Sequence, residues 1–277
     1  MHISGTLYLV ATPIGNLRDL SFRSLDILNQ VDLILCEDTR KSLILLKEFN
    51  IKTKFSSLHE FTNVKKIDKY ISYLESGKSI ALISDAGTPL ISDPGFEIVQ
   101  KAKEKDILVN PIPGPSSVIS ALIGSGLKTD KFIFEGFPPR KKNELENFLK
   151  KYIYEEKTLI LFESPRRIKK LVESSLKIFG RERRVSIAKE ISKKHQNFYT
   201  GTTENILGLI HNDKNLEKGE LVFLIEGTKD KSSINDFEEE ILMKELKEHL
   251  PLKRISKILA KISKKTSKEI YDTHIKK

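Results

Sequence analysis

Short apolar runs that suit β-strands alternate with longer helical patterns along most of this chain, and this alternation constrains its fold more than any other feature. The predicted strands are Thr6–Ala11, Val31–Glu37, Ser79–Ser84, Ile107–Ile112, Lys131–Gly136, Thr158–Phe162, Val185–Glu190 and Glu220–Glu226. Strands that alternate with helices are typical of α/β proteins, in which helices cross over the faces of a sheet. The uninterrupted apolar run Ile80–Ile83 indicates burial on both faces, as in mainly parallel sheets.

Three segments between these strands carry the helical period. They are Val64–Glu75, Phe96–Lys105 and Ile168–Phe179. In the first of them, one helical face is expected to be buried, and it consists of Ile67, Tyr70, Ile71 and Leu74. We therefore expect amphipathic helices that pack their apolar faces against a sheet.

A proline-rich run interrupts the pattern near the middle of the chain. Three prolines in Pro111-Ile112-Pro113-Gly114-Pro115 are predicted to stop both a β-ladder and a helix. A chain of 277 residues is also long for one domain. We predict one α/β domain over residues 1–113, a second over residues 114–230 and a helical extension over residues 231–277.

The predicted extension follows a polar linker at Thr228–Ser233 and carries three helical patterns. They cover Asp236–His249, Leu252–Ile262 and a last segment that begins at Thr266. Thr266 and Glu269, three residues apart, predict a capping box at the start of the last helix. The last two helices loosely resemble a helix-turn-helix pair.

Positive charge is concentrated in this extension. The last 27 residues hold nine lysines and arginines against Glu269 and Asp272, a net +7 of the whole chain's +10. Such a charge favours an anionic partner such as nucleic acid. Two explanations that need no partner stay open. In one, an A+T-rich coding bias accounts for the whole-chain excess of lysine. In the other, the charged tail is only a solvated helical face.

Several classes of protein are excluded. Cys36 is the only cysteine, so a disulfide framework and a cysteine-rich zinc site are absent. The first residues lack the basic and apolar regions of a secretory signal, and no apolar run is long enough to span a bilayer. The histidines show no ligand spacing, and the Rossmann and P-loop motifs are missing. We expect a cytoplasmic, metal-free protein.

Three loops rich in glycine and proline each follow a predicted strand. They are Ala11–Asn16, Ser84–Gly95 and Pro113–Ser117. Open α/β sheets bind ligands outside the carboxyl ends of their strands, and glycine lets a ligand approach the backbone. In the second loop, Asp85 is able to accept hydrogen bonds from an amine or a ribose hydroxyl. Each loop alone also fits an ordinary strand-to-helix turn.

These motifs together resemble a known family. The chain carries Leu7-Tyr8-Leu9-Val10-Ala11-Thr12-Pro13-Ile14-Gly15-Asn16, then Glu37-Asp38-Thr39-Arg40, then Ser84-Asp85-Ala86-Gly87-Thr88-Pro89-Leu90-Ile91-Ser92-Asp93-Pro94-Gly95, then Phe162-Glu163-Ser164-Pro165 and Lys218-Gly219-Glu220. Their order resembles the bacterial 16S ribosomal RNA cytidine-2′-O-methyltransferases, a group in the tetrapyrrole-methylase-like class of S-adenosylmethionine enzymes. The resemblance covers about residues 5 to 227. The family's His-x-His-Asn-Glu pattern is reduced here to His59-Glu60-Phe61-Thr62-Asn63, and a histidine common after the E-S-P motif is Arg166.

The resemblance implies two α/β domains of the tetrapyrrole-methylase type with S-adenosylmethionine bound in an interdomain cleft, usually in a homodimer. It implies methylation of a cytidine ribose 2′-OH in 16S ribosomal RNA of the small ribosomal subunit. At positions that match the family's motifs, the cofactor is expected to contact Pro13, Asp85, Gly87, Thr88, Pro89, Ser116 and Phe162.

Transfer of a methyl group to a hydroxyl needs alignment of the two groups and removal of the hydroxyl proton. Candidate groups lie in two clusters, Glu37, Asp38 and Arg40 in one and Lys189, Glu190 and Lys193 in the other. Of these we favour Glu190 and Lys193. A surface ion pair is the alternative explanation for each cluster.

Contacts to RNA are expected from five lysines and arginines and one histidine outside the cofactor loops. They are Arg40, His59, Lys253, Arg254, Lys257 and Lys261. Two other functions stay open on the same fold: a tetrapyrrole methyltransferase that acts on a small molecule, and a non-catalytic RNA-binding protein.

Overall fold

The computed structural model describes residues 5–228, 236–263 and 265–275. The chain divides into two compact units, which are described separately here. Unit 1 is Met1–Ser120 together with the short segment Ile191–Lys194, and unit 2 is Ala121–Glu190 together with His195–Lys277. The domain boundaries proposed from the sequence, after residues 113 and 230, stay predictions. Within the described residues, no helix is both long and apolar enough to cross a membrane.

Unit 1 is built on a five-stranded sheet in which every pair of neighbours is parallel. Its strands, in the sheet order β3-β2-β4-β1-β5, are Phe55–Ser57, Leu33–Cys36, Ile80–Ile83, Thr6–Val10 and Leu108–Ile112. Its helices are α1 (Phe22–Gln30), α2 (Thr39–Glu48), α3 (Val64–Glu75) and α4 (Phe96–Glu104), with a 3₁₀ turn η1 at Leu17–Asp19. Helix α5 (Ser117–Gly124) contains the boundary between the units. The predicted parallel sheet is confirmed for this unit.

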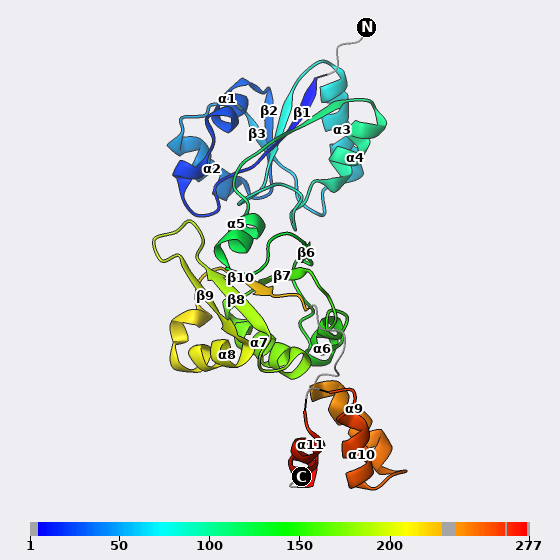
Figure 1. The fold of residues 1–277 in the computed structure, drawn as a ribbon. Coiled ribbons are helices and arrows are strands. Elements are labelled where there is room, and N and C mark those ends of the chain that lie inside the picture. The colour runs from blue at the N-terminus through cyan, green and yellow to red at the C-terminus, as the bar shows by residue number, and fades with distance from the viewer. Residues whose placement is uncertain (1–4, 229–235, 264, 276–277) are drawn as a thin grey trace. The chain divides into compact units, whose positions relative to one another are not determined.

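Helices cover both faces of the unit 1 sheet, with α1 and α2 on one face and α3 and α4 on the other (Figure 1). Successive strand residues point to opposite faces. Ile80 and Leu82 of β4 therefore pack in the cluster that contains α3 and α4, and Ala81 and Ile83 in the cluster that contains α1 and α2. Helix α3 has the predicted bounds, and its four buried residues are those that the sequence pattern indicates.

The expectation that the proline run stops the β-ladder is wrong at Pro111. This residue belongs to β5, where it pairs in register with Leu9 of β1. Strand β5 lies at the edge of the sheet, so among the described residues one side of it has no neighbouring strand. A proline is tolerated on an edge strand because its missing N–H is not required by a second partner.

Unit 2 contains a second five-stranded sheet, in the order β6-β7-β10-β8-β9. These strands are Phe132–Phe134, Thr158–Glu163, Leu221–Ile225, Arg184–Lys189 and Asn197–Thr202. Only β6 and β7 are parallel, and the other pairs are antiparallel. Strand β10 is a continuous apolar run and is buried along its whole length, although both of its neighbours are antiparallel.

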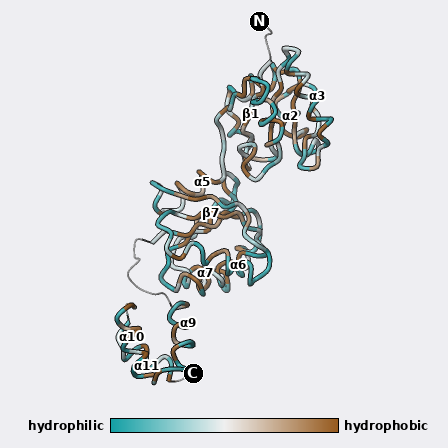
Figure 2. The backbone as a smooth tube through the Cα atoms, turned by 90° about the vertical axis from the view of Figure 1, so that its right-hand side faces the viewer, coloured by the Kyte–Doolittle hydropathy of each residue, from teal (hydrophilic) through white to brown (hydrophobic). Residues whose placement is uncertain are grey.

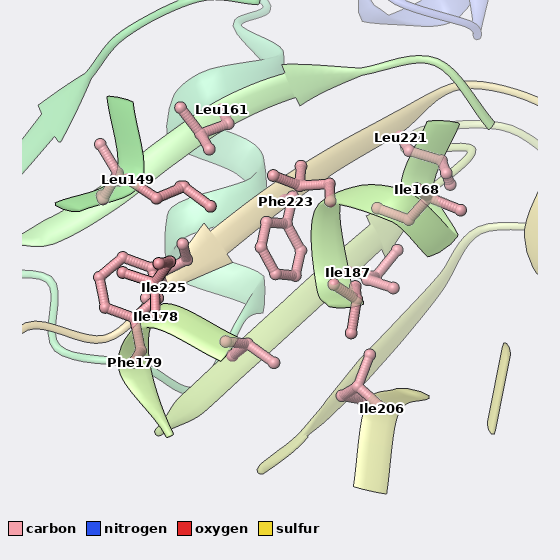
Figure 3. Close-up of a cluster of buried hydrophobic side chains, with 14 of the residues drawn as sticks. Leu149, Leu161, Ile168, Ile178, Phe179, Ile187, Ile206, Leu221, Phe223 and Ile225 are labelled. Carbon is pink, nitrogen blue, oxygen red and sulfur yellow. The ribbon is translucent and has the colours of Figure 1, made fainter. Parts of the chain in front are cut away.

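The core of unit 2 lies between one face of this sheet and three helices. The helices are α6 (Lys142–Lys150), α7 (Pro165–Phe179) and α8 (Thr203–Asn212), followed by a 3₁₀ turn η2 at Lys214–Glu217. Phe223 of β10 is fully buried at the centre of this cluster, with Ile187 of β8 and Ile168 of α7 among its neighbours in Figure 3. Helix α7 begins three residues before the predicted start because Pro165 favours the first position of a helix.

Three helices form the C-terminal part of unit 2. They are α9 (Asp236–Lys247), α10 (Leu252–Leu259) and α11 (Ser267–Ile275), and teal and brown alternate along them in Figure 2, as expected for amphipathic helices. Met243, Ile255, Leu259 and Ile270 form a small buried cluster. The predicted capping box is confirmed, because Thr266 and Glu269 exchange backbone-to-side-chain hydrogen bonds of 2.7 and 3.2 Å. Most of the predicted polar linker lies outside the described residues.

Candidate functional site

Parallel strands direct their carboxyl ends to one edge of the unit 1 sheet, and hydrogen bonds join the loops there. The Thr12 N–H donates to the Gly87 carbonyl over 2.9 Å, and the Gly87 N–H donates to the Thr12 carbonyl over 3.0 Å. The buried Thr12 hydroxyl also donates to the Ser84 carbonyl. The loops after β1 and β4 are therefore fixed against each other at a point where the strand order reverses direction, which is where open α/β sheets bind ligands.

The loop after β5 joins the same surface. The Thr88 hydroxyl donates to the Pro115 carbonyl over 3.0 Å. A Cβ atom on Gly114 would lie 2.9 Å from the Cβ of Ala11, so this glycine lets the third loop pack against the end of β1. The three loops that the sequence singled out thus form one continuous surface in unit 1.

The loop after β4 holds an unusual backbone. Leu90 and Ser92 adopt positive φ angles of 73° and 67° although neither is glycine. Gly95 has φ +125°, and a Cβ there would lie 2.6 Å from Leu82. A bulky residue in the left-handed region costs conformational energy, and such residues cluster at ligand sites. The backbone of this loop therefore supports a binding role.

Asp85 connects this loop to the end of β2. One carboxylate oxygen accepts a hydrogen bond of 3.0 Å from the Asp38 N–H, and the other accepts one of 2.7 Å from the Lys41 ammonium. A carboxylate has about four acceptor positions, so Asp85 keeps capacity for a ligand amine or hydroxyl.

Two further carboxyl groups stand nearby with raised pKa values. Burial, followed by the charge of Glu37, raises the pKa of Asp93 to about 6. Burial, followed by the charge of Asp85, also raises the pKa of Glu37. By contrast, hydrogen bonds from Arg40 lower the pKa of Asp38 to about 2. This edge of the sheet is therefore rich in hydrogen-bond acceptors and in negative charge, which suits a ligand with a positive charge and hydroxyl groups.

A pocket of 520 Å³ lies on the same edge of unit 1, beside the loops after β2 and β3 and the start of α4. Leu58, Ile67 and Ile98 give it buried apolar walls. Its polar lining includes Glu37, Asp93 and His59. Asp93 was noted in the sequence only as part of a motif, and the neighbouring Phe96, which also lines the pocket, was not predicted as a functional residue. A signal was present in the sequence, because Asp93-Pro94-Gly95-Phe96 is a turn that presents an aromatic residue at a helix start.

The structure brings most of the predicted cofactor residues together in unit 1. Gly87 and Thr88 lie at the joined loops, as described above. Pro13 and Pro89 are buried in the same loops, and the Ser116 hydroxyl accepts a hydrogen bond from the Ile119 N–H at the start of α5. Each of these positions stays a prediction for the cofactor.

Phe162, the remaining predicted cofactor residue, belongs to unit 2. Its ring lies 4.8 Å from that of Phe134 and 5.5 Å from that of Phe137. Directly after it, Glu163 is buried and forms an ion pair of 3.1 Å with Arg167. Arg167 also donates to the carbonyls of two neighbouring prolines, so the E-S-P motif holds the loop in front of the aromatic cluster.

The two residues favoured for proton removal are placed in different units. Glu190 in unit 2 has a positive φ of 50°, and its carboxylate accepts a hydrogen bond of 2.7 Å from the Glu220 N–H. Lys193 belongs to unit 1, where its side chain packs so closely on Gly15 that a Cβ there would lie 2.5 Å from the lysine Cγ. Lys193 therefore lies over the loop after β1.

The residues predicted to bind RNA are exposed. Arg40 holds Asp38 through two hydrogen bonds of 3.0 and 2.7 Å, and His59 begins a turn that Thr62 closes. The remaining four lie on or just after α10, where they share one exposed side of the helix; they are Lys253, Arg254, Lys257 and Lys261. Among the residues that the structure describes, no group of three histidine, cysteine or acidic side chains converges to hold a metal ion.

Comparison with known proteins adds independent findings. Residues 6–207 match the model of the tetrapyrrole (corrin/porphyrin) methylases. The chain is 42% identical to ribosomal RNA small subunit methyltransferase I of Haemophilus influenzae over 94% of this chain and 93% of that protein. It is 41% identical to the protein of the same name from Xylella fastidiosa, over 98% and 99% of the two chains.

Solved structures show the same fold at low sequence identity. A diphthine synthase superposes with a TM-score of 0.62 at 15% identity and covers 87% of this chain and 95% of its own. A uroporphyrin-III-C-methyltransferase from Thermus thermophilus superposes with a TM-score of 0.53 at 18% identity, over 80% and 94% of the two chains. These two comparisons support the fold alone.

Proposed function

Because the chain belongs to the tetrapyrrole (corrin/porphyrin) methylase family and, within it, to the ribosomal RNA small subunit methyltransferase I group, we propose that it methylates 16S ribosomal RNA in the small ribosomal subunit. The acceptor is the ribose 2′-OH of a cytidine, and the methyl donor is S-adenosylmethionine. The observation that carries this proposal is the identity of about 40% with named small-subunit methyltransferases over nearly the whole chain.

The residues present fit this methyl donor. S-adenosylmethionine supplies a methyl group that is already activated on a positively charged sulfonium. The carboxylates at the edge of the unit 1 sheet complement that charge, and Asp85 keeps acceptor positions for an amine or hydroxyl. We propose that Pro13, Gly87, Thr88, Pro89 and Ser116 line the site, and that Phe162 contributes from unit 2.

The chain's own groups must orient the hydroxyl and accept its proton, since a neutral alcohol is a weak nucleophile. Lys193 is the stronger of the two candidates because it lies over the loop after β1. A neutral lysine amine is able to take up a proton at Nζ. The Glu190 carboxylate already accepts a hydrogen bond from the Glu220 N–H, so we propose that Glu190 positions the segment that carries Lys193.

The exposed basic side of α10 supports the RNA partner. A small substrate has no phosphate backbone for Lys253, Arg254, Lys257 and Lys261 to follow, which argues against a tetrapyrrole substrate. A non-catalytic RNA-binding protein would bind RNA but give no heat with S-adenosylmethionine in calorimetry. We further propose that the protein acts as a homodimer in the cytoplasm, where ribosomal subunits are its substrate.

The direct test incubates the purified chain and labelled S-adenosylmethionine with small ribosomal subunits that lack the modification. We expect label in an alkali-resistant dinucleotide, because a 2′-O-methyl group blocks cleavage of the adjacent phosphodiester by alkali. Label in a base, or label in no RNA at all, would contradict the proposal. Subunits that already carry the modification serve as the control.

A further inference from the structure

The pocket beside α4 shares the loop after β4 with the site proposed for the methyl donor and lacks the other two loops of that site. Its lining includes Glu37, His59, Asp93 and Phe96 but no residue of the loop after β1 or of the loop after β5. It lies on the same edge of the same sheet, since Asp85 and Asp93 belong to one loop. The pocket is therefore able to hold a second group that takes part in the same reaction as the methyl donor.

The pocket combines a flat apolar surface with hydrogen-bond acceptors. The Phe96 side chain is 71% exposed although it is aromatic and is the first residue of α4. Phe61, which is 87% exposed, lies in the chain between two residues that line the pocket, Glu60 and Thr62. Exposed aromatic rings beside a cavity are the surfaces on which proteins stack unpaired nucleobases.

The charge of the lining indicates which ligand fits. Four carboxyl groups line the pocket, on Glu37, Glu60, Asp93 and Glu97, and no lysine or arginine is among the described residues that line it. These carboxylates would repel a phosphate. An amino group on a ring would meet acceptors, and carboxylates accept hydrogen bonds from the exocyclic amine of cytosine. The volume of 520 Å³ lies within the range of roughly 300–1,000 Å³ typical of small-molecule sites.

We propose that this pocket receives the base of the target nucleotide, stacked on Phe96 and held through its exocyclic amine by the carboxyl groups of Asp93 and Glu37. This inference rests on the proposed function and deepens it, because it assigns the base specificity of the reaction to a part of unit 1. A nucleotide in folded RNA must leave its stack before an enzyme is able to reach its ribose, and a pocket for the extruded base stabilises that state.

The test compares Phe96→Ala with Phe22→Ala in the full chain. Phe22 is a matched control, because it is the first residue of α1, is 89% exposed and does not line the pocket. We expect Phe96→Ala to lower kcat/KM for small subunits by about tenfold, the effect of losing one stacked base, with unchanged affinity for S-adenosylmethionine in calorimetry. Phe22→Ala should stay within about twofold of wild type.

A second measurement tests the carboxyl groups. The nucleotide that the wild type labels is changed from cytidine to uridine, whose carbonyl replaces the amine. The wild type should methylate the uridine substrate about tenfold less well than the cytidine substrate. Asp93→Asn should reduce this preference for cytidine, because the asparagine amide both donates and accepts hydrogen bonds and so fits either base. Thermal unfolding of each variant shows that it is folded.

Three results would overturn the inference. They are equal activity of Phe96→Ala and Phe22→Ala, weaker binding of S-adenosylmethionine by Phe96→Ala, and equal use of cytidine and uridine by the wild type. The second of these would assign the pocket to the methyl donor. Failure of the proposed function gives a different result, since the wild type would then label no ribosomal RNA.

Discussion

At the scale of single residues, Asp93 is held in surroundings that disfavour its charge. Burial and the neighbouring Glu37 raise its pKa to about 6, whereas an ordinary aspartate has a value of 3.8. The folded chain therefore binds more protons than the unfolded chain between these values, and the free energy of unfolding decreases as the pH rises through this window. Above about pH 6 the full cost of the charge is present.

We expect Asp93→Asn to stabilise the protein at pH 7.5, by on the order of 1 kcal/mol, because it removes that charge. At pH 4 the gain should largely disappear, since Asp93 is then mostly neutral in the folded chain. Urea unfolding at the two pH values measures the difference. The matched control is Asp26→Asn, an aspartate on the exposed side of α1. Equal effects of Asp93→Asn at both pH values would show that its charge is not disfavoured.

Glu190 and Lys193 differ in what their side chains already do. Glutamine keeps a carbonyl oxygen for the Glu220 N–H, so Glu190→Gln should retain stability and most activity, and Glu190→Ala should lose about 1 kcal/mol of stability.

Lys193→Gln should lower kcat by about 100-fold or more without weakening donor binding, which is the usual effect of removing a general base. Unfolding curves measure the loss of stability in the Glu190 variants, and single-turnover methyl transfer measures the loss of activity in the Lys193 variant. An inactive but stable Glu190→Gln would return the proton-transfer role to Glu190.

At the scale of elements, α10 presents two different sides. Ile255 and Leu259 face the small buried cluster with Met243 and Ile270, and the basic residues lie on the exposed side. Deletion of residues 251–277 would therefore remove three of the four buried residues of that cluster along with the charges. Substitution of exposed lysines tests the RNA contact without this loss of packing.

We expect Lys253→Ala/Lys257→Ala to weaken RNA binding and to reduce the slope of log affinity against log salt by roughly one for each lysine. The control is Lys244→Ala/Lys247→Ala on α9, because Glu245 on that helix and Glu248 just after it balance the charge of these exposed lysines. Filter binding at several salt concentrations measures both. An unchanged slope for the α10 variant would show that this side of the helix is only solvated.

At the scale of the whole molecule, the two units contain sheets of different construction. Unit 1 has a parallel sheet with helices on both faces, and its loops at one edge form the candidate site. Unit 2 has a mainly antiparallel sheet, and the last 27 residues of the chain, which belong to it, carry a net +7 of the whole chain's +10. The acidic pocket and the basic side of α10 therefore suit different parts of one RNA, a base in the first case and phosphates in the second.

The sequence by itself determined what depends on neighbours in the chain. The period of Val64–Glu75 gave α3 and its buried face, and the spacing of Thr266 and Glu269 gave the capping box, because both arise within a few residues. The edge strands β3 and β9 escaped prediction because they are only partly buried and carry polar residues such as Ser57 and Asn197, so no apolar run indicates them.

Only the tertiary structure decided which distant groups meet. The order of the strands, the antiparallel pairing of β10 and the place of Pro111 on an edge all depend on partners far away in the chain. The hydrogen bond from Asp38 to Asp85 spans 47 residues, and the pocket combines the loops after β2, β3 and β4 with the start of α4. Such contacts form because the sheet brings the carboxyl ends of its strands to one edge, which no local pattern encodes.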